Sequence, residues 1–260
     1  MSKKMKNAPI FYTVGQVKFN PVLDMQDFIS QLQKEWRSTN PDFTQDSVTD
    51  VQIHMPGPDK AAEVKTISSP RWHFKDTEGT SGYVLKTDSL SFHTTAYQDR
   101  DHFVASVLTG LDVVNKHVEL AYIEGVGVRT LDAVVPMATD RLDDYLRPGL
   151  LGLYEQLGGQ LKRSILQLDL DTTDGQLVSK VVLLKGRIGM PAELMPLQLT
   201  LGERVSAIDG THVVLDNDCI QKMRFPVSLD EVDKRVRALK SQVSNAFRKA
   251  ISDHAIKQWS

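Results

Sequence analysis

The fold is decided first by residues 11–19, FYTVGQVKF, and by the element that follows them. Apolar and polar side chains alternate along this stretch, which is typical of a strand with one buried face. Asn20-Pro21 ends the strand, and Asp24 can cap a helix that continues to about Trp36. The chain therefore opens with a strand that is followed by an amphipathic helix.

The next part of the chain reads as a series of short strands closed by a second helix. Runs of β-branched and aromatic residues between turn residues predict these strands, at Val48–Met55, Val64–Ile67, Trp72–Phe74, Tyr83–Leu85 and Leu90–Tyr97. A helix is predicted from Asp99 or Asp101 to His117, because apolar residues recur there at three- and four-residue steps.

The same order then begins again. Leu120–Leu131 reads as a strand, and a helix is expected from about Asp140 to Leu157, split by Pro148-Gly149. The strands that follow are predicted at Lys162–Leu170, at Leu177–Lys185, in a hairpin over Arg204–Asp216 around Asp209-Gly210, and at Met223–Phe225.

The final helix has the clearest signals. Ser228-Leu229-Asp230-Glu231 forms a capping box, in which the serine and the glutamate each satisfy an otherwise unpaired backbone N–H. The apolar residues that follow are spaced for one buried face, at Val232, Val236, Leu239, Val243 and Phe247. We expect this face to pack against the protein's own sheet, and a coiled-coil partner is the alternative.

Element order therefore predicts an α+β protein made of two β-α-β(n)-α units, residues 1–118 and 119–260. In each unit an antiparallel sheet would curl around a long closing helix. Steroidogenic-lipid-transfer-like folds, of the helix-grip type, and TATA-binder-like folds share this outline. The first type forms a ligand cavity and the second presents a saddle to a partner, so the fold does not decide the function.

Composition excludes several classes of protein. The chain has 41% hydrophobic and 25% charged residues and a net charge of -2, which is ordinary for a globular protein and gives no sign of a polyanion partner. A single cysteine, Cys219, excludes an internal disulfide. No apolar run is long enough for a signal peptide or a membrane span, so a cytoplasmic location is expected.

Motifs for catalysis, metals and nucleotides are missing from the sequence. The seven histidines show no metal-ligand spacing, and the GxSxG and GxxxxGK[ST] patterns are absent. Asp216 and Asp218 beside Cys219 disfavour a nucleophilic thiolate. We therefore expect no catalytic residues, no metal and no cofactor. His73 and His93 lie on predicted strands and could approach each other across the sheet, so we include them as ligand-binding candidates.

Residues 186–202, GRIGMPAELMPLQLTLG, form an apolar insert without a counterpart in the first half. Pro191 and Pro196 disfavour a regular central strand, because proline cannot donate to the ladder. We expect an exposed surface for a protein partner or a membrane, since exposed apolar patches mark such sites. Its contact residues would be Met190, Leu194, Met195 and Leu197. The alternative is a strand and loop packed into the core.

Arg129 is the third candidate for ligand binding. It follows a glycine-bearing strand, so we expect it to point into the space between sheet and helix. A buried guanidinium requires an anionic partner, because an unpaired buried charge is very costly. Asp132 and Asp144 are the expected partners if the role is structural.

The chain also resembles a sporadically distributed bacterial family of unknown function that is defined by an N-terminal NAPI-type motif. The resemblance covers nearly the whole chain and rests on Asn7-Ala8-Pro9-Ile10, Val17-Lys18-Phe19, Trp72-His73-Phe74, Tyr97, Gly127-Val128-Arg129, Asp144-Tyr145-Leu146, Pro148, Phe247 and Ile251-Ser252-Asp253. Leu131 and Asp132 stand where the family usually has an aromatic residue and an asparagine. The resemblance implies no assigned activity, but a patchy distribution suits mobile genes and antiphage defence.

From these features we expect a non-enzymatic sensor or adaptor that binds a ligand, a lipid surface or an operon-encoded protein partner. The main alternative is a nucleic-acid-binding or processing protein, which would use Arg71, Lys75, Lys86 and Arg100 on one sheet face. A third reading is an enzyme whose acid–base pair comes from His73, His93 and a carboxylate. A homo-oligomer is left open.

Overall fold

The computed structural model describes residues 5, 7–54, 63–137, 139–157, 159–194 and 197–260. Within these ranges nine strands form one antiparallel sheet, in the order β2-β3-β4-β5-β1-β6-β9-β8-β7. The strands are β1 (Ile10–Phe19), β2 (Asp42–His54), β3 (Glu63–Lys75), β4 (Ser81–Lys86), β5 (Ser89–Thr94), β6 (Ile123–Val134), β7 (Arg163–Asp171), β8 (Gln176–Arg187) and β9 (Asp209–Phe225). The predicted α+β class is confirmed.

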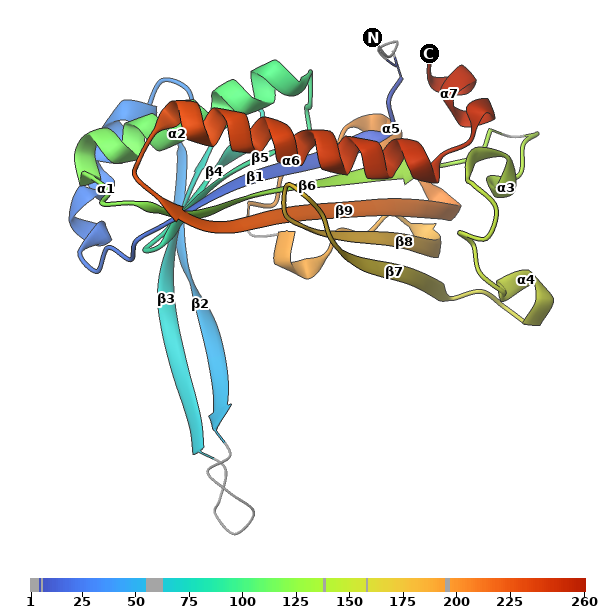
Figure 1. Cartoon of the computed structure of the whole chain (residues 1–260), viewed down its shortest axis with the longest axis horizontal. Helices are drawn as coiled ribbons and strands as arrows, with labels where there is room; N and C mark the ends of the chain where they lie inside the picture. Colours follow the sequence, from blue (N-terminus) through green and yellow to red (C-terminus); the bar gives the residue numbers. More distant parts are fainter. Residues whose placement is uncertain (1–4, 6, 55–62, 138, 158, 195–196) are drawn as a thin grey trace.

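Three long helices among the described residues lie along one face of this sheet (Figure 1). They are α1 (Met25–Trp36), α2 (Arg100–Val118) and α6 (Leu229–Ala250). The shorter elements are α3 (Leu142–Tyr145), α4 (Tyr154–Leu157), the 3-10 turn η1 (Ala192–Leu194), α5 (Glu203–Ser206) and α7 (Asp253–Trp259). Thus the helix expected near 140–157 exists only as two single turns, one on each side of Pro148-Gly149.

The closing helix α6 forms as its sequence predicts. The Ser228 hydroxyl accepts a hydrogen bond from the Glu231 backbone N–H at 3.3 Å, so the N-cap is in place. Val232, Val236 and Leu239 are buried on the face that packs against β6 and β9. The expectation that α6 packs on the protein's own sheet is therefore confirmed.

The strand bounds predicted in two regions of the chain, residues 48–74 and 204–225, are wrong. Over the described residues, the fragments predicted between residues 48 and 74 belong to one long hairpin, β2 and β3, which extends away from the body of the sheet (Figure 1). Met55, the predicted end of the first fragment, lies outside the described residues. Pro70 lies inside β3 opposite Ser47, just before the stretch where β4 also pairs with β3. No second strand therefore requires a hydrogen bond from its missing N–H.

The hairpin expected over Arg204–Asp216 does not form. Strand β9 begins at Asp209 and runs without a break through the fragment predicted at Met223–Phe225.

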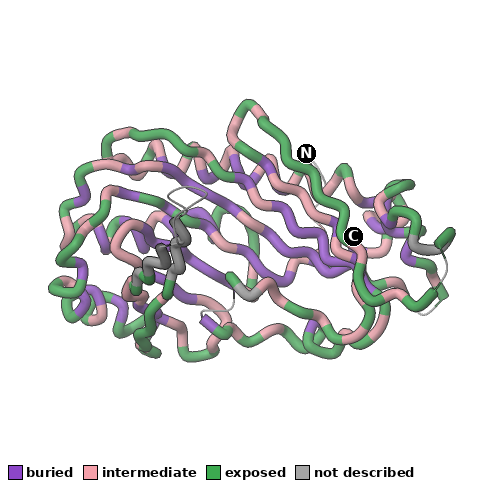
Figure 2. The backbone as a smooth tube through the Cα atoms, turned by 90° about the horizontal axis from the view of Figure 1, so that it is seen from below, coloured by how far each residue is buried: buried purple, intermediate pink, exposed green. Residues whose placement is uncertain are grey.

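Residues from both predicted units belong to one continuous sheet. β1 pairs with β6 at the centre, for example through Val14 opposite Arg129 and Gly15 opposite Val128. Helix α2 packs closely over this junction: a Cβ atom added at Gly15 would lie 2.7 Å from the Val107 side chain. Buried residues concentrate on these central strands, as Figure 2 shows from the side opposite to the helices.

The core beneath the helices consists of two apolar clusters with a row of polar residues between them. One cluster lies under α1, α2 and the first part of α6, and the other lies under the end of α6 and α7. The polar row crosses five neighbouring strands in register, through Thr94, Thr13, Thr130, Asn217 and Ser179. Four of these side chains are buried, and Ser179 donates to Asn217 Oδ1 at 2.7 Å.

Candidate functional site

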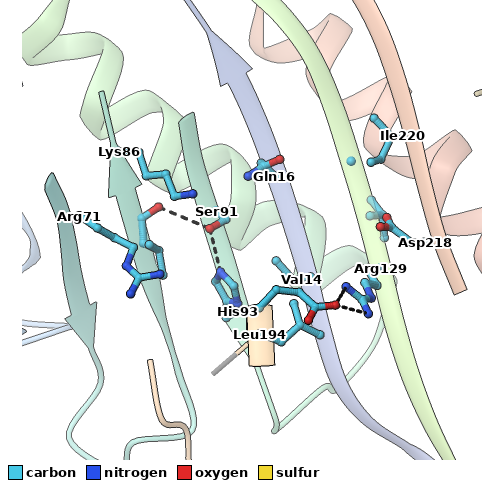
Figure 3. A pocket seen from close by; sticks show the side chains of 14 residues that line it. Val14, Gln16, Arg71, Lys86, Ser91, His93, Arg129, Leu194, Asp218 and Ile220 are labelled. Atoms are coloured by element: carbon cyan, nitrogen blue, oxygen red, sulfur yellow. Dashed lines mark hydrogen bonds and ion pairs between the residues drawn. The ribbon is translucent and has the colours of Figure 1, made fainter. Parts of the chain in front are cut away.

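The helix-free face of the sheet carries a hollow of about 260 Å³. It crosses six adjacent strands, β3, β4, β5, β1, β6 and β9, and the insert borders it (Figure 3). Its lining residues are Val14, Gln16, Arg71, Val84, Lys86, Ser91, His93, Gly127, Val128, Arg129, Glu193, Leu194, Asp218 and Ile220.

Strand alternation explains why polar groups gather here. Successive side chains of a strand point to opposite faces. Val17 and Cys219 point into the core under the helices, so their neighbours Gln16 and Asp218 point into the hollow. Figure 3 shows Gln16 on β1 between Lys86 on one side and Asp218 on the other.

The insert is a cover for this face and not an exposed contact surface. Leu194 and Leu197 are 7% and 2% exposed, so the prediction that they are exposed is wrong. Leu194 and the partly buried Met190 belong to an apolar cluster with Phe11 and Tyr12, and the Tyr12 hydroxyl donates to the Leu194 carbonyl at 3.0 Å. None of the three long helices covers this part of the sheet; the insert, together with Val205 of α5, removes its apolar side chains from water. Met195 lies outside the described residues.

Arg129 lies on the helix-free face, so the expected position between sheet and helix is wrong. Its Nε and Nη2 atoms donate to the two carboxylate oxygens of Asp216, each at 2.7 Å, and Nη1 lies 3.1 Å from Glu193 Oε1. The expected acidic partner exists, but it is neither Asp132 nor Asp144. Asp132, three residues further along β6, points to the helices. Arg129 thus lines the hollow with its charge already paired.

The two candidate histidines share the helix-free face, and each is held by its own partners. His93 lines the hollow, with Nδ1 2.7 Å from the Tyr12 hydroxyl and Nε2 2.7 Å from the Ser91 hydroxyl. Burial lowers the pKa of His93 to about 3, so the ring is neutral at pH 7. His73 lies outside the hollow's lining, with Nε2 2.9 Å from Asp46 Oδ1, and burial lowers its pKa. No hydrogen bond joins the two rings in the described part of the chain.

The basic residues expected for nucleic-acid binding are only partly brought together. Arg71 and Lys75 share this face, but Arg71 donates twice to Asp46, at 2.8 and 2.6 Å, and Lys75 lies 2.9 Å from Asp42. Arg100 is not on this face, because it begins α2 on the opposite side of the sheet. Lys86 makes no ion pair with any described residue.

Asp218 is the functional candidate that sequence reasoning misses. It lies opposite Arg129 in the β6–β9 register, and it makes no hydrogen bond or ion pair among the residues described. Burial raises its pKa to about 6, and the neighbouring Asp216 adds to this while Arg129 opposes it. Alternation places Asp218 and Asp216 on the same face of β9, but the sequence does not reveal that β9 pairs with β6. Asp218 and Lys86 therefore carry opposite charges near the two ends of the hollow.

The described residues offer no metal site, since they contain no group of three His, Cys, Asp or Glu side chains that could hold an ion. Cys219 is buried, and burial with the nearby Asp218 raises the pKa of its thiol to about 11. This thiol is therefore protonated at neutral pH and is not an activated nucleophile.

Helix length and sequence comparison complete the description of the molecule. Among the helices described, none has a stretch long and apolar enough to span a membrane. No model of a known protein family matches the chain, and no curated protein matches it.

Proposed function

We propose that the protein is a non-enzymatic sensor or adaptor whose hollow accepts an extended segment of a protein partner. The observation that supports this most directly is that Lys86 and Asp218, near opposite ends of the hollow, have no ion pair with any described residue. Four strand spacings separate β4 from β9, which corresponds to ~19 Å. An extended segment covers that distance in about six residues. The bound segment would carry an acidic residue toward Lys86 and a basic residue toward Asp218.

The arrangement of the sheet supports a two-unit, TATA-binder-like organisation as part of this proposal. The sheet order is mirrored about its centre: β1 lies beside β5, the last strand before α2, and β6 lies beside β9, the last strand before α6. We propose that residues 1–118 and 119–260 are the two β-α-β(n)-α units. The sheet is covered by helices on one face and carries an open hollow on the other. This arrangement allows the open face to bind a partner, as a saddle-shaped sheet does.

A protein partner fits this face better than a nucleic acid or a lipid surface. Nucleic-acid phosphates require free cations, whereas Arg71, Lys75 and Arg129 already have carboxylate partners. Docking of the insert on a lipid surface would require its apolar side chains to be exposed, and Leu194 and Leu197 are buried. The alternative of an enzyme that uses His73 and His93 for acid–base catalysis would require a histidine that titrates near neutral pH, and the low pKa of His93 argues against that role.

The cellular setting rests on the family resemblance alone. A sporadically distributed bacterial family suits antiphage defence, with the protein in the cytoplasm and the partner encoded in the same operon. The test is phage plating on host cells that carry the wild-type gene, no gene, or a gene for the Lys86→Glu variant. Equal plaque counts in all three strains would contradict the defence role.

Binding itself is tested by selecting peptides from a random display library on the purified protein. We expect enrichment of peptides with an acidic and a basic residue about four to six positions apart, in one orientation. The double variant Lys86→Glu, Asp218→Lys should enrich the reversed order of charges, because both ends of the hollow change sign. Lys234→Glu, at an exposed position on α6, is the matched control and should leave the selection unchanged.

Two results would refute the proposed binding mode. The first is a selection that shows no charge pattern or that is unaffected by the double reversal. The second is salt-dependent binding of generic oligonucleotides that the Lys86→Glu variant loses, which would favour the nucleic-acid alternative.

A further inference from the structure

A second cavity, of about 390 Å³, lies on the helix-facing side of the sheet and is separate from the hollow. It is bounded by α6, by β6, by the start of β1 and by the segment that leads into α2. The residues that the argument uses are Tyr97, Arg100, Thr130, Asp132, Lys240 and Arg248. Arg100 is exposed at the mouth of the cavity, so the site is open to solvent on that side.

Two buried charged residues face each other across this cavity. Lys240 comes from α6 and Asp132 from β6, and they are 5% and 4% exposed. No ion pair within 4.0 Å and no hydrogen bond connects either charged group to another residue in the described ranges. The ammonium of Lys240 lies 4.7 Å from the centre of the Tyr97 ring, which gives it one favourable contact.

This arrangement is costly. A buried charge is tolerated when it is closely paired and hydrogen-bonded; Lys240 and Asp132 attract each other, but in the described ranges neither makes a hydrogen bond or an ion pair within 4.0 Å. Burial raises the pKa of Asp132 and lowers the pKa of Lys240, and the attraction between the two groups offsets this only in part. Two apolar residues of similar size would pack more favourably at these positions, so stability alone does not account for the pair.

The position of the pair also points to a ligand. Asp132 lies two residues beyond Thr130, a member of the polar row that separates the two apolar clusters of the core. Lys240 directly follows Leu239, which lies near the end of the buried α6 face that packs in the first apolar cluster. The cavity thus lies where the helix-facing core is already polar, and its volume is typical of sites for small metabolites.

We propose that this cavity binds a small zwitterion of the α-amino acid class. Its carboxylate would accept hydrogen bonds from the Lys240 ammonium, and its ammonium group would donate to the Asp132 carboxylate. An anion alone would leave Asp132 without a partner, and a cation alone would leave Lys240 without one. A zwitterion satisfies both. Arg100, Arg248 and Asp99 also line the cavity, so these three residues add a net positive charge, which favours ligands whose side chain is acidic or neutral.

The inference does not depend on peptide binding in the hollow, because the two sites lie on opposite faces of the sheet. Binding of a small molecule at α6 would, however, give the proposed sensor a means of regulation. Failure of the peptide selection would leave the amino-acid site intact, and the reverse also holds.

The experiment is a thermal-shift screen of the purified full chain with the common amino acids, followed by titration calorimetry of those that stabilise it. We expect a subset to raise the melting temperature in a concentration-dependent way. N-acetyl and amide analogues of the best amino acid should bind at least about ten-fold more weakly, because each lacks one of the two charges. Stabilisation by both analogues equal to that by the amino acid would overturn the proposal.

Variants tie the binding to the two buried residues. Lys240→Met and Asp132→Asn should each weaken binding at least about ten-fold. Both replacements remove a buried charge, so both variants should fold, which circular dichroism checks before binding is measured. Lys234→Met, on the exposed side of the same helix, is the matched control and should bind as the wild type does. Lack of binding by every amino acid tested, unchanged binding in both cavity variants, or equal stabilisation by inorganic phosphate alone would each refute the zwitterion site.

Discussion

Replacing Asp218 with asparagine should stabilise the protein at alkaline pH. Burial raises the pKa of Asp218 to about 6 in the folded protein, whereas an unfolded aspartate titrates near 3.9. The folded protein therefore holds this proton more tightly than the unfolded chain does. Stability consequently falls as the pH rises from about 4 to about 6, and the penalty for ionising Asp218 is complete above that range.

The size of the effect follows from this difference of about two pH units, each of which is equivalent to about 1.4 kcal/mol. Because Asp218 is only partly buried, solvent screening reduces the total from ~3 kcal/mol to about 1–2 kcal/mol. Asp218→Asn should therefore raise the free energy of unfolding by that amount at pH 8. At pH 4 the wild-type carboxyl is largely protonated, and the gain should nearly vanish.

The assay is urea unfolding of the wild type and the variant at pH 4 and pH 8. Asp169→Asn, at an exposed position of the edge strand β7, is the control and should shift stability by less than about 0.5 kcal/mol at either pH. The reasoning fails if Asp218→Asn is neutral or destabilising at pH 8, or if its gain is the same at both pH values. Such a result would mean that Asp218 has a partner in solution and does not face the hollow unmatched.

Three further substitutions test the site and the core. Arg129→Met should destabilise the protein by about 3–5 kcal/mol at pH 7 in urea unfolding, because it leaves the buried Asp216 carboxylate without its partner; a loss below about 1 kcal/mol would show that water replaces the pair. Leu239→Ala should cost about 2–5 kcal/mol, since Leu239 is 1% exposed, and an unchanged melting temperature would contradict the packing of α6. Leu194→Asp should release the insert and make it sensitive to limited proteolysis; a folded, protease-resistant variant would support the exposed insert that the sequence predicts.

Local signals in the sequence predict individual elements well. Alternation over residues 11–19 predicts β1, the apolar stripe before His117 predicts α2, and the capping box at Ser228 predicts the start of α6. These signals depend on short-range periodicity and on hydrogen bonds within one element. Both can be recognised from the residues of a single sequence. Side-chain alternation also places Arg129 and Asp218 on definite faces of their strands once the strands are paired.

Long-range pairing is the part that the sequence does not reveal. Arg129 lies 87 residues from Asp216, and their contact depends on the pairing of β6 with β9, for which no local pattern exists. The same limit explains why the insert is wrongly predicted to be exposed. Its apolar residues and prolines suit an exposed contact surface, and only the uncovered apolar patch around Phe11 and Tyr12 shows that they are needed as a cover. Lys240 escapes notice because an isolated lysine in a helix normally lies in solvent.

The polar row beneath the helices has a consequence for the cooperativity of the molecule. The apolar contacts of α6 are divided between two clusters: Val236 belongs to the first, and Phe247 packs against the second. Contiguous apolar packing is what makes regions of a protein unfold together, so a polar boundary allows the two regions to open with different free energies. The end of α6 and α7 can therefore loosen while the sheet beneath α2 stays closed. A ligand bound at Lys240 and Asp132 would lie beside this boundary, where tightening one region also restrains the other.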